Sequence, residues 1–246
     1  MRASRIYTQA SLAVDCVVSL DGSTGHYLAR VLRTSEGDQV VLFNGDGFDY
    51  QATVTKVDRQ SVSVQVSGAT QRLTESPLRV TLVQAIGRGE RMDFTLQKAT
   101  ELGVYAIQPL LSERVGIKLD EKRQSKRVAH WQGVVVSACE QSGRSVIPQV
   151  FEPLTVSAWL EKNAAQASPL MNLILDPEAG TSLVSAIDQM QDLAILIGPE
   201  GGFSQQGLDQ VESNGGIAAS LGPRVLRTET AGPAAIAVLQ ATAGDF

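Results

Sequence analysis

The sequence predicts an α/β protein in which a small β-rich region precedes a larger domain built on a parallel sheet. Short strands of alternating polarity separated by turn residues fill the first seventy positions. After Pro77, strands alternate with helices, and each of these strands is apolar throughout, as in parallel sheets covered on both faces. The polar stretch 67–77 has the composition of a linker. We therefore expect two domains, residues 1–72 and residues 73–246.

The N-terminal domain is expected to be a small barrel. Residues 38–43 (DQVVLF), 48–57 and 61–66 (SVSVQV) each predict a strand, because apolar side chains alternate with polar ones. The NGDG sequence at 44–47 predicts the turn between the first two strands. One helix is expected at 23–32.

The larger domain follows the order strand, helix, strand. Strands are expected at residues 78–86, 106–110, 170–175, 193–197 and 217–221, with a short extended segment at 148–151. Helices are expected at residues 90–102, 120–141 and 156–163, from residue 204, and at 231–242. The apolar stripe of helix 90–102 leaves Arg91 and Lys98 to face solvent or a ligand.

The charge of the chain is acidic in total but unevenly distributed. The 21 basic and 26 acidic residues give a net charge of −5, which by itself argues against nucleic-acid binding. Residues 1–72 hold 7 basic and 7 acidic side chains, residues 73–150 hold 11 and 8, and residues 151–246 hold 3 and 11. Any RNA-binding face is therefore expected to be local and to draw on the middle segment.

Cysteine and histidine counts exclude several classes of protein. Two cysteines and two histidines cannot form a disulfide framework or a Cys/His zinc cluster, so no metal is expected. The first ten residues lack the apolar core of a signal peptide, and no apolar run reaches membrane length. We expect a cytoplasmic protein with no membrane partner. Cys139 is expected in the core, His26 in a structural or capping role, and His130 at the surface or at a subunit contact.

Three loops that follow predicted strands are candidates for a ligand site. They cover residues 175–180, 198–204 and 221–230, at the carboxyl ends of strands, where open α/β sheets bind ligands. The chain contains neither G-x-G-x-x-G nor G-x-x-x-x-G-K-[ST], so a dinucleotide or P-loop enzyme is not expected. Each loop alone could be an ordinary strand-to-helix turn. Two glycine-rich loops in the same region favour a ligand.

The sequences GPEGGFS at 198–204 and LGPRVLRTET at 221–230 resemble the two signature loops of SPOUT methyltransferases, in particular the RsmE family of ribosomal RNA uridine-N3 methyltransferases. Further similar segments, in family order, are RIY (5–7), HYLARVLR (26–33), RGERMDFTLQKATELGV (88–104), PLLSERVGIKL (109–119) and ACEQSGR (138–144). The resemblance covers nearly the whole chain and is weakest across residues 151–190.

The resemblance implies a PUA-like RNA-binding barrel joined to a SPOUT domain with a trefoil knot. It also implies the cofactor S-adenosylmethionine, a homodimer, and methylation at N3 of one uridine of small-subunit (16S) rRNA. The substrate is either free rRNA or the assembled small subunit. Two alternatives remain open: a non-catalytic RNA-binding assembly factor, and a generic α/β enzyme acting on a small metabolite, which would leave the barrel without a purpose.

Site residues are carried over from the family motifs position by position. The cofactor-binding candidates are Leu175, Ile197, Gly198, Glu200, Gly201, Gly202, Leu221, Gly222, Leu226 and Arg227. The sequence departs from the family at Ala231-Gly232-Pro233, where a stronger helix former is expected, and we expect Pro233 to shift the helix start.

Methyl transfer to N3 requires alignment of the reactants and removal of a proton. Glu229 is the candidate base, and Arg227 or Arg224 is the candidate stabiliser of the uridine anion. Alternatively, Glu229 only occupies a first helical turn, where the helix dipole favours a carboxylate. The RNA-binding candidates are Arg5, Arg30, Arg33, Arg88, Arg91, Lys98, Arg114, Lys118 and Arg144, for each of which the alternative is a solvated charged face.

Overall fold

The structure is a computed structural model that describes residues 3–87, 89–111, 121–187 and 192–246. The chain divides into two compact units. Unit 1 consists of residues 1–75 and 139–147, and unit 2 consists of residues 76–138 and 148–246. A segment from the middle of the chain thus packs with the N-terminal residues.

Unit 1 is built on a five-stranded sheet with the order β1-β3-β4-β5-β2. Its strands are β1 (Ser4–Tyr7), β2 (Val17–Leu20), β3 (Gln39–Phe43), β4 (Phe48–Val57) and β5 (Val62–Gln71). β1 pairs with β3 in parallel, and the other neighbours are antiparallel. The three predicted strands are confirmed, although β5 extends into the predicted linker. β1 and β2 were not predicted.

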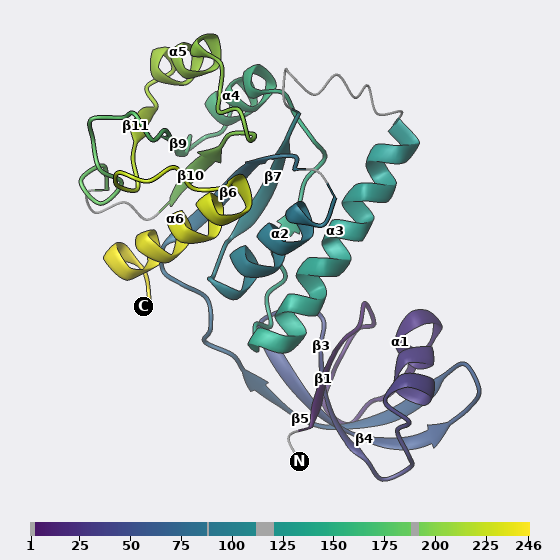
Figure 1. The fold of residues 1–246 in the computed structure, drawn as a ribbon. Helices are drawn as coiled ribbons and strands as arrows, with labels where there is room; N and C mark the ends of the chain where they lie inside the picture. The colour runs from purple at the N-terminus through teal and green to yellow at the C-terminus, as the bar shows by residue number, and fades with distance from the viewer. Residues whose placement is uncertain (1–2, 88, 112–120, 188–191) are drawn as a thin grey trace. The chain divides into compact units, whose positions relative to one another are not determined.

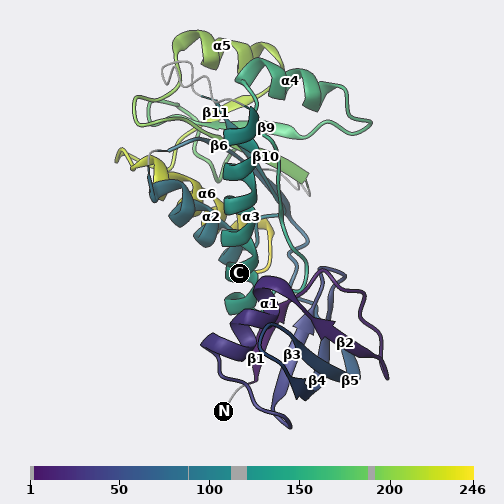
Figure 2. The same ribbon diagram turned by 90° about the vertical axis from the view of Figure 1, so that its right-hand side faces the viewer.

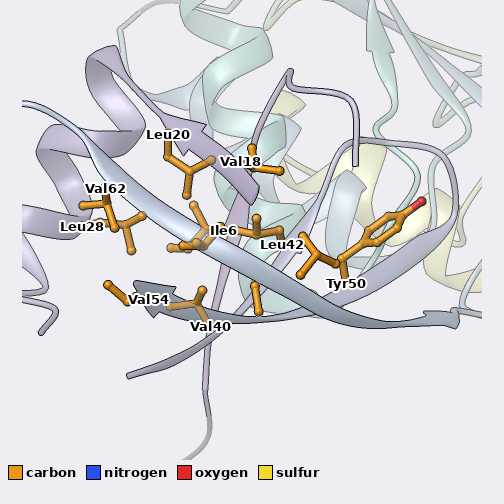
Figure 3. Close-up of a cluster of buried hydrophobic side chains, with 12 residues drawn as sticks. Ile6, Val18, Leu20, Leu28, Val40, Leu42, Tyr50, Val54 and Val62 are labelled. Carbon is orange, nitrogen blue, oxygen red and sulfur yellow. The ribbon is translucent and has the colours of Figure 1, made fainter. Parts of the chain in front are cut away.

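The core of unit 1 follows from the alternation of side chains along these strands. Val62, Val64 and Val66 of β5 are fully buried, while Ser63 and Gln65 between them are only partly covered. Figure 3 shows how the buried side chains of the sheet meet Leu28 in one cluster. Burial of one such Val or Leu side chain contributes about 1.5–3 kcal/mol, so this cluster is what holds the small unit together.

The predicted helix at 23–32 forms as two short pieces. α1 (Gly22–His26) continues directly into a π-helical turn, η1 (Tyr27–Val31). Leu28 enters the core, whereas Tyr27 is exposed. A Cβ at Gly25 would collide with the carbonyl oxygen of Leu20, so this helix can lie against β2 only because residue 25 is glycine.

The buried side chain of Arg5 ties the segment 139–147 to the strands of unit 1. Its Nη2 atom donates to Asp49 Oδ1 at 2.6 Å and to Ser145 Oγ at 2.7 Å, and its Nη1 atom donates to the carbonyl oxygen of Cys139 at 2.8 Å. Burial raises the pKa of Asp49, but two other effects together outweigh it and hold the pKa below its usual value. Arg5 and Ser145 donate hydrogen bonds to the carboxylate, and the positive charges of Arg5 and Arg72 lie close to it. Long-range polar contacts therefore attach the segment 139–147 to the strands of unit 1.

Unit 2 is built on a six-stranded parallel sheet with the order β11-β9-β10-β6-β7-β8. The strands are β6 (Arg79–Ala85), β7 (Ala106–Leu110), β8 (Gln149–Val150), β9 (Met171–Leu175), β10 (Asp192–Ile197) and β11 (Ile217–Ala219). The helices are α2 (Arg91–Glu101), α3 (Glu121–Ser142, whose last turn belongs to unit 1), α4 (Val156–Ala164), α5 (Gln205–Ser213) and α6 (Thr228–Ala243). The predicted α/β fold with a parallel sheet is confirmed.

Helices cover both faces of this sheet. Figures 1 and 2 show α2 and α6 side by side on one face and α4 and α5 on the other. On the second face, Trp159 and Leu160 of α4 and Val211 of α5 pack against the sheet in one buried cluster. The two helices predicted at 156–163 and from residue 204 thus each place apolar side chains against the sheet.

The start of α6 corrects the expected effect of Pro233. The helix begins at Thr228, five residues before Pro233, so the proline lies inside the helix and does not shift its start. Pro233 has no N–H group to donate to the carbonyl of Glu229 four residues earlier. Gly232 allows α6 to lie close to β6, because a Cβ there would be 3.0 Å from Gln84 Oε1.

The remaining expectations for single residues can be placed in the fold. Cys139 is fully buried, as predicted, and burial raises the pKa of its thiol to about 12. His130 lies at the surface, where its Nε2 atom is 2.8 Å from Asp93 Oδ2. His26 is exposed at the end of α1 and is the N-cap residue of η1, although its side chain makes no capping hydrogen bond there. None of the described helices is both long and apolar enough to cross a membrane.

Candidate active site

The three predicted loops meet in one pocket at the carboxyl edge of the unit 2 sheet. β9, β10 and β11 run in parallel, so the loops that follow Leu175, Ile197 and Ala219 all leave from the same edge. They enclose a cavity of about 470 Å³, within the range of small-molecule sites. The residues that line it are Arg91, Leu175, Pro177, Ile197, Gly198, Pro199, Glu200, Gly202, Leu221, Gly222, Arg224, Val225, Leu226, Arg227, Thr228, Glu229 and Ala231.

Every cofactor-binding candidate except Gly201 lines this pocket. Gly201 is exposed in the turn between Glu200 and Gly202. The candidate base Glu229 and both candidate stabilisers, Arg224 and Arg227, also line the pocket. The structure thus brings together residues that are up to 54 positions apart in the sequence, from Leu175 to Glu229.

Glycines shape the wall formed by the loop after β10. A Cβ at Gly198 would lie 3.1 Å from both the backbone nitrogen and the ring of Phe203. Gly202 and Gly222 have φ values of +70° and +95°, a region that side-chain-bearing residues rarely adopt. At these positions no Cβ stands between the main chain and the pocket, so a ligand can approach the backbone closely, between apolar side chains such as Leu175 and Ile197.

Three charged side chains, those of Arg91, Glu200 and Glu229, meet beside the loop at 198–204. The Nη1 atom of Arg91 donates to Glu200 Oε1 at 2.8 Å, and its Nε atom lies 3.8 Å from Glu229 Oε1. The side chain of Glu229 is only 16% exposed, compared with 47% for Arg91. Glu229 Oε2 is buried and has no hydrogen-bond partner among the described residues. One carboxylate oxygen therefore stays available to accept a proton or a hydrogen bond from a ligand.

Glu229 occupies the first turn of α6, two residues after the N-cap residue Arg227. The helix dipole favours a carboxylate at this position, as the alternative interpretation requires. The same turn also directs Glu229 into the pocket wall, next to Thr228 and Ala231. Its placement is therefore compatible with both interpretations, and its catalytic role stays a prediction.

The features of the pocket fit S-adenosylmethionine. Apolar side chains with open backbone groups suit an adenine ring, which needs flat apolar contacts and a few hydrogen bonds. The pocket presents both signs of charge, the carboxylates of Glu200 and Glu229 and the guanidiniums of Arg91, Arg224 and Arg227. This mixture suits a ligand that carries a sulfonium, an ammonium and a carboxylate group. Leu175, Ile197, Gly198, Gly202, Leu221 and Leu226 are the residues that could hold the adenosyl part.

The RNA-binding candidates lie in different surroundings. Arg30 and Arg33 are exposed on unit 1, and Lys98 pairs with Glu101 at 2.8 Å on α2. Arg91 turns into the pocket. Arg88, Arg114 and Lys118 lie outside the described residues.

Arg5 and Arg144 are placed differently from what the sequence suggests. The side chains of Arg5 and Arg144 are only 8% and 5% exposed. Arg5 is held by Asp49, and Arg144 forms an ion pair with Glu75. A guanidinium that is buried and paired cannot reach a phosphate, so we assign both residues a structural role in unit 1 in place of RNA contact.

Arg91 is the pocket residue that sequence reasoning assigned to another role. The pattern of helix 90–102 left it facing solvent or a ligand, and the RNA assignment rested on its charge alone. The order of the strands could have placed Arg91 at the pocket. α2 follows β6, and the carboxyl end of β6 lies at the same edge of the sheet as those of β9 and β10. Pro177, Pro199 and Val225 lie in the predicted loops but were not singled out.

The described residues contain no group of three or more His, Cys, Asp or Glu side chains that could hold a metal ion.

Two domain families match the chain. An RNA methyltransferase domain matches residues 74–240, and an RNA methyltransferase PUA domain matches residues 20–67. The predicted PUA-like N-terminal domain is confirmed by the second match.

Similar proteins carry one shared description. "Ribosomal RNA small subunit methyltransferase E" of Buchnera aphidicola (Schizaphis graminum) is 33% identical over 100% of this chain and 98% of that protein. The protein of the same description from Bacillus subtilis is 31% identical over 87% of this chain and 85% of that protein.

Solved structures agree over the full length. A ribosomal RNA small subunit methyltransferase E from Neisseria gonorrhoeae, bound to S-adenosyl methionine, is 38% identical with a TM-score of 0.93 and covers 100% of both chains. A methyltransferase from Legionella pneumophila in complex with the same cofactor is 37% identical with a TM-score of 0.94 and also covers 100% of both chains.

Proposed function

The chain belongs to the RsmE family of ribosomal RNA small subunit methyltransferases, and we propose that it uses S-adenosylmethionine to methylate N3 of one uridine in 16S rRNA. One observation carries the proposal. The loops with the family motifs form a single pocket whose apolar walls, open backbone and carboxylates suit this cofactor. The Neisseria relative, similar over its whole length, holds S-adenosyl methionine.

The cofactor would supply a methyl group on a positively charged sulfur. Leu175, Ile197 and Leu226 would enclose its adenosyl part, and the backbone of Gly198 and Gly202 would approach it closely. The contribution of the chain is then mainly positional, because direct displacement requires N3, the methyl carbon and the sulfur to be in line.

We propose that the carboxylate of Glu229 is the base that accepts the proton from N3. The cofactor would supply the methyl group to N3 and leave as a neutral thioether, and the Glu229 carboxylate would accept the N3–H proton. The buried Oε2 atom, unpartnered among the described residues, is the natural acceptor. Arg224 and Arg227, which line the same pocket, would stabilise the negative charge that develops on the uracil ring.

We further propose the wider organisation that the family implies. The chain would act as a homodimer in the cytoplasm, with domains at residues 1–72 and 73–246 and a SPOUT-type trefoil knot around the cofactor loops. Exposed arginines of unit 1, Arg30 and Arg33, would contact RNA phosphates.

Isothermal titration calorimetry with S-adenosylmethionine tests this proposal against the assembly-factor alternative. An enzyme of this type should bind the cofactor and also the product S-adenosylhomocysteine. Absence of binding at millimolar cofactor would contradict the proposal and favour a non-catalytic RNA-binding protein.

A further inference from the structure

Arg91 connects two carboxylates that belong to different elements of the pocket. It is the first residue of α2, Glu200 lies in the loop after β10, and Glu229 lies in the first turn of α6. The Arg91 guanidinium is 2.8 Å from Glu200 Oε1 and 3.8 Å from Glu229 Oε1. One cation therefore links the proposed cofactor loop to the proposed base.

The ion pair between Arg91 and Glu200 adds little to the stability of the fold. Arg91 is 47% exposed and Glu200 is 45% exposed, and pairs in such surroundings contribute little to the free energy of folding. Their geometry has a different consequence. The planar guanidinium fixes the direction of the Glu200 carboxylate through a directed N–H hydrogen bond. Its charge attracts Glu229 Oε1 at 3.8 Å, a distance longer than a hydrogen bond.

The surroundings of Glu229 offer its Oε2 atom no hydrogen-bond donor among the described residues. Glu229 borders a narrow gap with no room for a water molecule, which is also lined by Gln84, Arg91, Met92, Thr95 and Glu200. Gln84 Oε1 and Glu229 Oε2 are both buried and have no hydrogen-bond partner among the described residues. Two acceptors without a donor do not orient each other, so the guanidinium at 3.8 Å is the described group placed to hold Glu229.

We propose that Arg91 is a positioning residue that couples the cofactor loop to the base, and that it does not contact RNA. Through Glu200 it holds the loop at 198–204 against α2, and through Glu229 Oε1 it keeps Oε2 directed at the reacting atoms. This inference rests on the proposed function. It assigns Arg91 an effect on cofactor affinity and on the rate of the chemical step, and none on RNA affinity.

The test uses the full-length variants Arg91→Ala, Arg91→Lys, Glu200→Gln and the double variant Arg91→Ala/Glu200→Gln. Three quantities are measured: cofactor affinity by calorimetry, the single-turnover methylation rate at saturating RNA and cofactor, and RNA affinity over a range of salt. Arg79→Ala is the matched control, because Arg79 forms a similarly exposed ion pair with Asp192 on the same unit, away from the pocket.

We expect Arg91→Ala to weaken cofactor binding about two- to fivefold, the value of one exposed ion pair. We expect it to lower the single-turnover rate by about tenfold or more, because a misaligned base costs more than a lost contact. The double variant should lose less cofactor affinity than the product of the two single losses, because Arg91 and Glu200 act partly through each other. Arg91→Lys should restore cofactor affinity in part and the rate less, since lysine keeps the charge without the planar fork.

Three outcomes would overturn the inference. The first is an Arg91→Ala protein with the affinity and rate of the wild type. The second is an unchanged cofactor affinity together with weaker RNA binding and a shallower salt dependence, which would make Arg91 a phosphate contact. The third is a double variant whose loss of cofactor affinity equals the product of the losses in Arg91→Ala and Glu200→Gln, which would mean that the two residues act independently. If instead the wild-type protein binds no cofactor, the proposed function itself fails.

Discussion

The backbone N–H of Gly202 donates a hydrogen bond to the carbonyl oxygen of Pro199 at 2.9 Å, and this closes the turn that forms one wall of the pocket. The turn requires a φ of +70° at Gly202. A left-handed backbone costs a residue with a side chain about 1–2 kcal/mol, so the wall depends on glycine at this position.

We expect Gly202→Val to abolish detectable cofactor binding, because a β-branched residue would force the turn into another conformation. Calorimetry with S-adenosylmethionine measures the effect. Gly215→Val is the matched control: Gly215 also has a positive φ, +77°, and open space at its Cβ, but does not line the pocket. Equal cofactor affinity in the two variants would refute the assignment of the loop at 198–204.

We expect Glu229→Gln to lower the turnover number at least a hundredfold while changing cofactor affinity less than threefold. The amide keeps the shape of the side chain but cannot accept the N3 proton, and a general base typically contributes about 10²–10⁴-fold to the rate. Glu178→Gln, an exposed carboxylate in the loop after β9, is the control and should react like the wild type. A Glu229→Gln enzyme as fast as wild type would remove Glu229 from the mechanism.

We expect Arg30→Ala to weaken RNA binding and to make its salt dependence shallower. Loss of one phosphate contact lowers the slope of log K against log[salt] by about 0.7–0.9. Filter binding or fluorescence anisotropy at several salt concentrations gives the slope. Arg59→Ala removes another exposed arginine of unit 1 and should leave the slope unchanged. The same slope for wild type and Arg30→Ala would exclude Arg30 from the RNA interface.

We expect Asp49→Asn to destabilise the protein by about 3 kcal/mol, because it leaves the buried Arg5 without its counter-charge. Asp192→Asn removes an exposed pair and should cost less than about 1 kcal/mol in urea unfolding.

The pH dependence follows from the direction of the Asp49 shift. Its pKa is lower in the folded protein than the ordinary value of 3.8, so the stabilisation is complete above that value and is lost as the pH falls through the folded pKa. Wild type should therefore lose stability below about pH 4, and Asp49→Asn should lose less. Parallel losses in both proteins would contradict this account.

Elements with a strong local pattern could be predicted from the sequence. The strand at 106–110 has the predicted bounds, and Ser204 caps α5 by accepting a hydrogen bond from the N–H of Gly207, as a serine before a helix suggests. β1 was not predicted because it is four residues long and gains its stability from pairing in parallel with β3, more than thirty residues away. Pairing of this kind leaves no local pattern.

Side-chain partners far apart in the sequence could not be predicted either. Arg5 and Arg144 have the charge of RNA-binding residues, and only their buried contacts with Asp49 and Glu75 reveal a structural role. The pocket was more predictable, because its walls come from loops whose glycines are required by the local backbone. Arg91 enters from a separate helix, and its position follows from the order of the strands.

The central claim is tested most directly by methylation of small ribosomal subunits isolated from a strain that lacks the modification. The protein and labelled S-adenosylmethionine are added, and the modified nucleoside is identified by mass spectrometry and mapped in the 16S rRNA. We predict N3-methyluridine at a single position, formed by the wild type and not by Gly202→Val. Absence of methyl transfer to both the subunits and free rRNA, or a methyl group on another atom, would contradict the account.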